Sequence, residues 1–403
     1  MKMIRFLCFS AFLTGILTSR ALPSAETSST SLPKMWQIVW ADKANIQYFT
    51  ELKNMGYDGL FKCHSLAPNY PGGEWRLVER IEGQYDWTSL QQCLDIALAV
   101  NMWFIPEIVI NVPPQWFLDR YPDALLKDSR GITATQPDDN GAPYLLSPWF
   151  IASGQGDLEI QRYLNEFIRI VSDYPNVPAI MIGNFKLNVL PWKMGLTGED
   201  FTYWPIFDAA AIQSYSARFG TSPIATWDQY NSMSNPNQAA FRDWLTGAIR
   251  HNIQNKYIPW TSAFHGYLVI NASIWDNDGV KPSIFTTTTP EMTIAKQNAI
   301  KSAGATRIII NDDNMGDYGL VAFQQLDIEI AHNNDFLIYG ERVPYKSDWA
   351  RLFNMWAGFD PPSDGFINIE DPDVYWSSRF RTMYGPSSEP FIFKLYQPMV
   401  IRN

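Results

Sequence analysis

Cysteine and histidine are scarce in this chain of 403 residues, which has three cysteines and four histidines. No spacing of these residues resembles a zinc site, and we expect neither a metal nor another cofactor. The glycine-rich loop that follows the first strand of dinucleotide-binding domains is also missing. Beyond the N-terminal segment, no apolar run is long enough to cross a membrane. These absences argue against zinc-dependent enzymes, dinucleotide-dependent enzymes and membrane-spanning proteins.

Charged residues are few as well, at 18% of the chain, whereas apolar residues make up 46%. This balance predicts a sizeable folded core and argues against disorder. Aromatic residues are frequent at 15%, and the chain has 16 tryptophans. Many rings must lie in the core, but the number leaves some for a cleft, where flat rings suit flat ligands.

The N-terminus has the pattern of a secretory signal. A basic start with Lys2 and Arg5 is followed by an apolar run over 6–17 and by small residues up to Ala21. We predict cleavage near Ala21 or Ala25 and therefore a secreted protein, either periplasmic or extracellular. The alternative is a membrane anchor, but the run is short for a full span.

The predicted organisation is a signal peptide over 1–21, a small and polar linker over 22–34, and one large domain over 35–403. Loss of the signal removes three basic residues and no acidic one, so the net charge moves from −10 to −13. An acidic surface argues against nucleic acid and other anionic polymers as partners. It is compatible with a neutral substrate.

Two cysteines remain in the predicted mature chain, Cys63 and Cys93. An exported protein with two cysteines can pair them, and their predicted places at the end of a strand and on the next helix permit contact. Two buried thiols are the equally open alternative. The chain also holds one N-x-S/T sequon, at Asn271, which matters only if the host glycosylates.

Short apolar segments alternate with longer amphipathic ones from Met35 onward, which is typical of strands followed by helices. Eight such alternations predict an α/β fold, a (β/α)8 TIM barrel in which helices surround parallel strands. A doubly wound open sheet is the competing topology, but it would normally carry the missing glycine-rich loop. We expect strands at 35–42, 58–65, 102–111, 177–191, 257–266, 306–313, 336–343 and 364–371. We expect helices at 45–56, 88–101, 158–174, 290–304, 319–334 and 347–359, and two more in a long insertion over 189–256.

Active sites of such barrels lie at the C-terminal ends of the strands, where this sequence gathers carboxylates. Glu107 interrupts the apolar run of the third expected strand, and a buried carboxylate needs a partner or a raised pKa. Glu341 ends the seventh strand, although Arg342 beside it offers a plain ion pair instead. Such acids suit general acid/base chemistry or a carboxylate nucleophile. The other candidates from the strand ends are His64, Lys186, Asn188, His265 and Asp312.

Tryptophans in predicted loops add candidate contacts for a sugar. We assign Trp116 and Trp192 to substrate binding, and Trp149 and Trp204 lie in predicted loops as well. Loop tryptophans can stack on sugar faces, but anchoring of the loop itself is the alternative.

Several motifs resemble glycosidase barrels. EGQYDWTSL at 82–90 resembles the G-x-Y-D-[WF]-x-x-L segment before the second helix of many such enzymes. VPPQWFLDRYPDALLKDSRG at 112–131 is similar to a loop of the family 42 β-galactosidases, and NVPAIMIGNF at 176–185 is similar to that family's approach to strand four. YSARFGTSPIATWDQYN at 215–231 resembles the helix and turn that follow. PPQW and FLIYGERV are weakly similar to β-amylases.

The resemblance covers roughly residues 35–260 and implies an eight-stranded barrel with two catalytic glutamates. One follows an asparagine at the end of strand four and acts as general acid/base, and the other ends strand seven as the nucleophile. By element order Glu341 takes the strand-seven place, while the Asn-Glu pair falls on Leu187 and Asn188. An amide cannot deliver a proton to a leaving oxygen, and loss of general acid help typically costs on the order of 10²–10⁴ in rate.

Three readings of the missing acid follow. In the first, another carboxylate replaces it, with Glu107 the first candidate and Glu199 or Asp200 behind it. A separation from Glu341 of about 5 Å would then suggest retention, and roughly 6.5–9.5 Å inversion. In the second, the barrel binds carbohydrate without cleaving it. In the third, the alignment is shifted, but this cannot restore the motif because no glutamate lies between Glu166 and Glu199. We favour an exported glycoside hydrolase acting on an oligo- or polysaccharide over an inactive sugar-binding barrel.

Overall fold

The structure, a computed structural model, describes residues 32, 35–40, 43–64, 73–133, 145–183, 203–271, 290–312, 321–341 and 363–368. Some residues in these ranges are described by their backbone only, among them His64, Asp312 and Glu341. The chain divides into two compact units, Met1–Ser31 and Leu32–Asn403, and every described residue belongs to the second. The predicted signal lies outside the described residues and stays a prediction.

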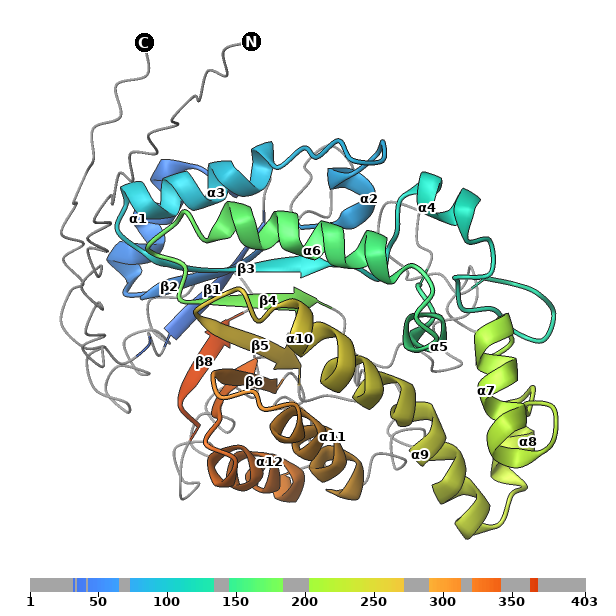
Figure 1. Cartoon of the computed structure of the whole chain (residues 1–403). Coiled ribbons are helices and arrows are strands. Elements are labelled where there is room, and N and C mark those ends of the chain that lie inside the picture. Colours follow the sequence, from blue (N-terminus) through green and yellow to red (C-terminus); the bar gives the residue numbers. More distant parts are fainter. Residues whose placement is uncertain are drawn as a thin grey trace, which may run out of the picture. The chain divides into compact units, whose positions relative to one another are not determined.

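Eight parallel strands close into a barrel in chain order (Figure 1). Each strand pairs with its neighbours in the sequence, and β8 completes the ring by pairing with β1. The predicted TIM barrel is therefore confirmed, and the open sheet is excluded. The strands are β1 Met35–Trp40, β2 Gly59–His64, β3 Trp103–Val109, β4 Ala179–Gly183, β5 Tyr267–Asn271, β6 Ile308–Asp312, β7 Leu337–Glu341 and β8 Gly365–Asn368.

Helices connect the strands, and the stretch between β4 and β5 carries the long predicted insertion (Figure 1). No helix among the described residues is both long and apolar enough to span a membrane. The helix predicted at 347–359 lies outside the described residues. The helices are α1 Ile46–Met55, α2 Trp75–Val78, α3 Thr88–Ala99, α4 Gln115–Arg120, α5 Pro148–Ala152, α6 Asp157–Val171, α7 Ala209–Phe219, α8 Trp227–Asn231, α9 Asn235–Asn252, the π-helix Ile253–Tyr257, α10 Ile258–Trp260, α11 Pro290–Ser302 and α12 Val321–Asn333.

Local sequence signals begin and end several helices. Asn45 accepts a hydrogen bond from the Tyr48 amide at the start of α1, at 2.9 Å. Gly56 ends that helix with a φ of 100°, a conformation that glycine adopts without steric cost. Thr226 and Gln229 form a capping box at the start of α8. These signals explain why the helix boundaries follow the sequence closely.

Apolar side chains fill the barrel interior in layers. Trp36, Ile105, Val269 and Tyr339, which come from the four odd-numbered strands, are buried together in the inner cluster, and we call them the floor layer. The ring centroids of Trp36 and Tyr339 lie 6.5 Å apart. Gly59 leaves room for the indole, because a Cβ at that position would lie 2.3 Å from the Trp36 ring. The floor layer therefore closes the barrel with packed side chains.

A second, outer cluster lies between the strands and the helices, and aromatic rings stack within it. Trp75 and Trp87 both stack on Tyr163 of α6, with centroid distances of 5.4 and 5.5 Å. The Tyr163 hydroxyl donates a hydrogen bond to the Gly73 carbonyl at 2.9 Å, and burial raises the pKa of this phenol well above its usual range. These rings hold α2 and the start of α3 against α6.

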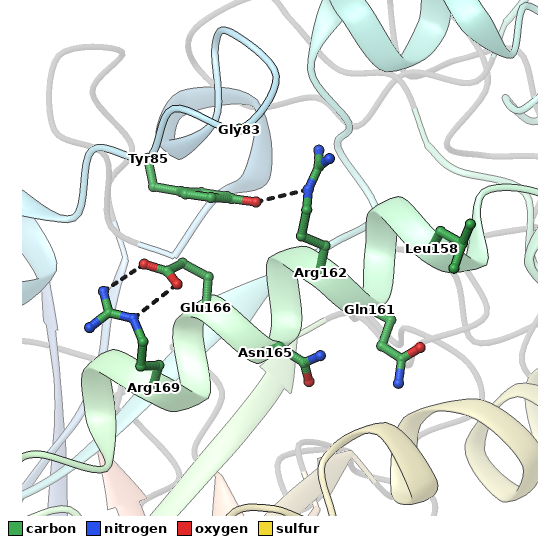
Figure 2. Close-up of a pocket in the computed structure, with 8 residues that line it drawn as sticks. All are labelled: Gly83, Tyr85, Leu158, Gln161, Arg162, Asn165, Glu166 and Arg169. Atoms are coloured by element: carbon green, nitrogen blue, oxygen red, sulfur yellow. Dashed lines mark hydrogen bonds and ion pairs between the residues drawn. The ribbon is translucent and has the colours of Figure 1, made fainter. Parts of the chain in front are cut away.

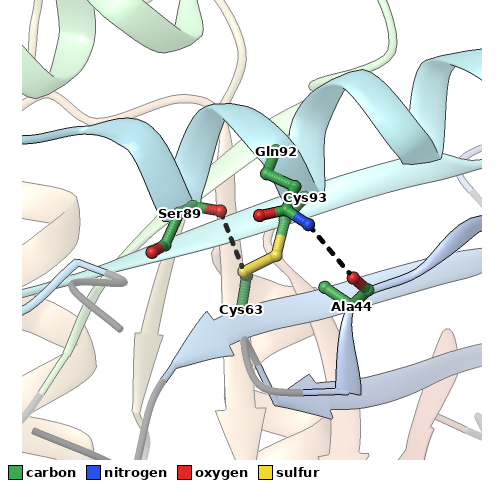
Figure 3. The surroundings of a disulfide bond; sticks show 5 residues. All are labelled: Ala44, Cys63, Ser89, Gln92 and Cys93. Carbon is green, nitrogen blue, oxygen red and sulfur yellow. Dashed lines mark hydrogen bonds between the residues drawn. A yellow bond between two sulfur atoms is a disulfide. The ribbon is translucent and has the colours of Figure 1, made fainter. Parts of the chain in front are cut away.

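Cys63 and Cys93 form a disulfide between β2 and α3 (Figure 3). Their Cα atoms lie 6.5 Å apart, and both residues are fully buried in the outer cluster. Of the two alternatives left open by the sequence, the structure contains the disulfide.

The prediction of the fifth strand is wrong. Most of 257–266 belongs to the end of the π-helix, α10 and a following turn, and β5 begins at Tyr267. Buried residues of this helical run, such as Ile253 and Tyr257, pack in the outer cluster, so a helix rich in apolar and aromatic residues imitated a short strand. The other strands lie inside their predicted ranges. Within its described residues, 203–256, the insertion carries three α-helices before the π-helix, rather than the two helical segments predicted.

Candidate functional site

Glu107 lies on the inner face of β3. Ile105, two residues earlier, belongs to the inner cluster, and residues two apart share a face of a strand. Met181, which pairs with Glu107 in the ladder to β4, belongs to the same cluster. Glu107 is 6% exposed. The carboxylate that interrupts an apolar run in the sequence is therefore a buried acid of the barrel interior.

Glu341, the last residue of β7, takes the same level of the barrel as Glu107. The ladder that starts at Glu107 runs through β4, β5 and β6 and reaches Leu337 in β7. The strands of such a barrel are tilted and staggered. At a fixed height along the barrel axis, each successive strand therefore places a residue about one position beyond the ladder partner. Because β7 is four strands on from β3, that height is reached at Glu341.

Four residues of the odd-numbered strands share this level, and we call them the acid layer: Ile38, Glu107, Asn271 and Glu341. Each lies two residues beyond a member of the floor layer in its own strand. In the ring of eight strands, β3 and β7 stand opposite each other, so the two acids come from facing walls. For Asn271 and Glu341 the described atoms are those of the backbone.

Asn311 is a polar residue of the barrel interior that the sequence pattern did not single out. It is fully buried and lies two residues after Ile309 of the inner cluster. Asp312, the predicted candidate, is the next residue and therefore lies on the opposite face of β6. That face carries Ile308 and Ile310, which belong to the outer cluster. The sequence IIIND contained a usable signal, because residues two apart share a face of a strand. The residue that shares the face of Ile309 is Asn311, not Asp312.

The segment that precedes α2 packs against the end of β3. Val109 donates its amide to the Gly73 carbonyl at 2.7 Å, and a Cβ on Gly73 would lie 1.8 Å from the Glu107 carbonyl oxygen. Glu74 forms an isolated bridge with Val109 and is 5% exposed. Its carboxylate accepts a hydrogen bond from Arg76 at 3.3 Å. A second buried acid, which the sequence analysis missed, therefore stands at the C-terminal end of β3.

His265 does not lie at the C-terminal end of a strand. It is exposed and precedes β5, and its carbonyl accepts a hydrogen bond from the Arg307 guanidinium just before β6. The prediction that His265 ends strand five is wrong because the stretch before it is helical. Asn271 takes the strand end instead.

β-Galactosidases are among the known proteins to which this chain is similar in sequence or structure. Residues 73–141 match the family described as β-galactosidase, glycoside hydrolase family 42. A β-galactosidase of Clostridium cellulovorans, BgaA, is 35% identical over 57 residues, which are 14% of this chain and 9% of that protein. The solved β-galactosidase of the psychrophilic Marinomonas ef1 has a TM-score of 0.50 and 14% identity, over 83% of this chain and 53% of that one. That of Bacillus circulans sp. alkalophilus has a TM-score of 0.49 and 14% identity, over 84% and 50%.

The closed eight-stranded barrel and this likeness agree on the fold. The chain has a glycoside hydrolase-like barrel. It spans about half the length of the solved β-galactosidases and 9% of the curated one. The matched range of the family includes Glu107 and the segment that packs on it.

Trp116, a predicted sugar contact, lies in α4 of the glycosidase-like barrel rather than in a loop. Its indole N–H donates to the Glu79 carbonyl at 2.8 Å, and its ring meets Trp75 edge-on with centroids 6.0 Å apart. The guanidinium groups of Arg120 and Arg162 lie 5.5 and 5.6 Å from its ring. The donor and the ring are both engaged within the protein, which favours the anchoring alternative.

The remaining predicted contacts are placed only in part. Trp149 and Trp204 are 3% and 1% exposed and belong to the core. Lys186, Asn188 and Trp192 lie outside the described residues and stay predictions. Within the described part of the chain, no group of three or more His, Cys, Asp and Glu side chains is arranged to hold a metal ion.

A hollow of about 570 Å³ lies on the outer face of α6 in the glycosidase-like barrel (Figure 2). Gly83 and Tyr85 line it together with polar side chains of α6, and the Tyr85 hydroxyl accepts a hydrogen bond from Arg162 at 3.0 Å. Arg169 and Glu166 pair along the helix at 2.6 Å. Because α6 turns its other face to the outer cluster, this hollow lies outside the barrel and is not part of the candidate active site.

Proposed function

We propose that this protein is an exported glycoside hydrolase that acts on an oligo- or polysaccharide, with Glu107 and Glu341 as its catalytic carboxylates. The observation that carries the proposal is their shared level on facing strands, two residues beyond the floor layer in each strand. Most glycoside hydrolases use two carboxyl groups that flank the scissile bond. Two acids from facing walls at the C-terminal ends of a barrel meet this requirement.

The two acids receive different roles in this proposal. Glu107 serves as the general acid, because it is a buried acid of the barrel interior, 6% exposed, on the strand next to the one where the acid was expected. A protonated carboxyl group can then give its proton to the leaving oxygen. Glu341, at the strand end, serves as the nucleophile or as the base that activates water.

Polar residues near the two acids are the proposed ligand contacts. Asn311, one layer below the acid layer, joins His64, Lys186 and Asn188 in this role, and Trp192 supplies a ring for stacking on the sugar. Asn188 replaces the acid expected at strand four, and an amide there can orient a sugar hydroxyl through hydrogen bonds.

The likeness to β-galactosidases suggests a β-galactoside as the first substrate to test. Because the chain spans about half the length of the solved relatives, the sugar is a proposal of its own. Export rests on the basic and apolar pattern of residues 1–21.

The proposal predicts that turnover depends on both acids. Glu107→Gln and Glu341→Gln should each lower kcat/KM by about 10²-fold or more on natural glycans, because each amide removes a proton carrier or a nucleophile. Glu74→Gln is the matched control, since Glu74 is a buried acid at the same end of β3 but outside the acid layer. Its turnover should stay within several-fold of the parent. A panel of aryl glycosides and oligosaccharides, with thermal unfolding of each variant, measures the effect.

Other outcomes of this experiment contradict the assignment. Unchanged turnover in both the Glu107→Gln and Glu341→Gln variants would remove these residues from the mechanism. A parent protein that binds glycans but hydrolyses none would instead establish the sugar-binding barrel.

A further inference from the structure

Strand β2 carries one extra residue near its end. Val39 of β1 pairs with Lys62, but the next residue, Trp40, pairs with His64, so Cys63 has no counterpart in β1. Lys62 and Cys63 have φ angles of 80° and 51°. Such left-handed conformations are unfavourable for residues with a Cβ and persist where surrounding contacts impose them. The end of β2 is therefore a β-bulge.

The bulge changes which residues at the end of β2 lie on the inner face of the barrel. Phe61 lies in the inner cluster, whereas Cys63, two residues later, lies in the outer cluster. In a regular strand both would share a face. Ile38 of the inner cluster pairs with Phe61, and Trp40, two residues after Ile38, pairs with His64. The extra residue thus brings His64, in place of Cys63, to the register position on the inner face.

The disulfide holds the extra residue away from the barrel interior. Cys63 is bonded to Cys93 of α3, and both are fully buried (Figure 3). Next to Cys93, the Gln92 amide donates to the Ala44 carbonyl at 3.5 Å and ties α3 to the chain that leads into α1. On the other side, Pro106 of β3 stands opposite the bulge. Proline occurs in sheets mainly at edges and bulges, because it has no amide to donate.

We propose that the Cys63–Cys93 disulfide is a positioning element that holds the β2 bulge and thereby places His64 on the inner face, in the layer above the acid layer. With the bond removed, Cys63 can take the place opposite Trp40, and a one-residue slip carries His64 to the outer face. The placement of His64 does not depend on what the protein binds. Its importance for a sugar rests on the proposed function.

The chain offers a direct test, because deletion of residue 63 should remove the need for the disulfide. In Cys93→Ser the histidine ring of residue 64 should change its surroundings. In Cys93→Ser with Cys63 deleted, His64 follows Lys62 directly and regains its place opposite Trp40 in a regular ladder. Histidine-labelled NMR spectra report this, since the chain has only four histidines and the loss of one signal in His64→Gln assigns that residue.

The expected result is a shift of the His64 resonance in Cys93→Ser and its return toward the parent position in the deletion variant. The resonances of His251, His265 and His332 should stay in place as internal controls. An unmoved His64 resonance in folded Cys93→Ser, or no return after the deletion, would overturn the proposal. If Cys93→Ser fails to fold, circular dichroism decides: the deletion in the same background must restore a folded spectrum and a thermal unfolding transition, and a variant that stays unfolded contradicts the proposal. No substrate is needed, so failure here is distinct from failure of the proposed hydrolysis.

Discussion

Asp208 is a buried carboxylate that caps helix α7. It accepts a hydrogen bond from the Ala211 amide at 3.0 Å and is 1% exposed. Burial raises its pKa from 3.8 to about 6, although hydrogen bonds from Ala211 and Ser147 act in the opposite direction. One residue therefore makes the stability of the domain depend on pH in mildly acidic solution.

The sign of this dependence follows from proton binding. Between 3.8 and about 6 the folded state binds more protons at Asp208 than the unfolded state, so the stabilisation is full below this window and is lost as the pH rises through it. Asp208→Asn keeps a good cap and removes the titration. The free energy of unfolding of the variant relative to the parent should therefore rise by up to about 3 kcal/mol from about pH 4 to about pH 7. Urea unfolding across that range measures it, and a constant difference would contradict the burial effect.

At the residue scale, the sequence predicted those site residues whose signal is local. Glu107 stood out because burying a carboxylate among apolar residues costs free energy unless a hydrogen-bond or ion-pair partner compensates. Asn311 and Glu74 were missed because an amide or an acid near a strand end is common in loops and caps. His265 was misplaced because its assignment depended on the boundary of another element, not on its own chemistry.

Among the elements, the π-helix Ile253–Tyr257 marks the point where the insertion rejoins the barrel. It carries Lys256, whose ammonium pairs with Asp157 in the first turn of α6, with side-chain exposures of 11% and 33%. An acid in the first turn also suits the helix dipole. The pair therefore fastens the end of the insertion to a helix of the barrel wall.

Breaking this pair should cost more than breaking an exposed one. Lys256→Met should lower the free energy of unfolding by about 1–3 kcal/mol, because it leaves Asp157 partly buried without its cation. Adding Asp157→Asn should recover part of the loss. Arg169→Met, which removes an exposed pair with Glu166 in the same helix, should cost about 1 kcal/mol or less. Chemical unfolding of the parent, Lys256→Met, Asp157→Asn and the double variant gives the coupling energy, and purely additive losses would show that the two side chains do not act together.

The alternation of short apolar strands with amphipathic helices was enough to predict most elements. The fifth strand failed because YIPWTSAFHG is short, apolar and aromatic, a composition shared by strands and by buried helical turns. The bulge in β2 had no sequence signal of its own. Pro106 and the two cysteines mark it only after the register between strands is known.

For the whole molecule, closure of the barrel depends on how tightly the floor layer is packed. Gly59→Ala should destabilise the protein by about 1–3 kcal/mol, because the added Cβ would lie 2.3 Å from the Trp36 ring, which packs against Tyr339. Gly247→Ala is the matched control in helix α9, where the nearest atom is 3.9 Å away on Arg250. It should stabilise by about 0.5–1 kcal/mol, since alanine is the better helix former. Thermal unfolding measures both changes, and equal signs would contradict the packing argument.

The fold class was predictable because eight strand–helix alternations permit few architectures. The shared level of Glu107 and Glu341 was not, since it arises only when the tilted strands close and the stagger between them is fixed. Distance along the sequence carries no information about which residues meet across a ring. Closure of the barrel places the two residues at one level on opposite strands.

Gly73 limits how freely the surroundings of Glu107 can vary. Any side chain at this position would meet a backbone oxygen, not a neighbour that can choose another rotamer. Substitution would therefore have to move the main chain of β3 itself. For protein engineering, only glycine fits at position 73. Substitutions near Glu107 are therefore limited in part by a residue that has no side chain.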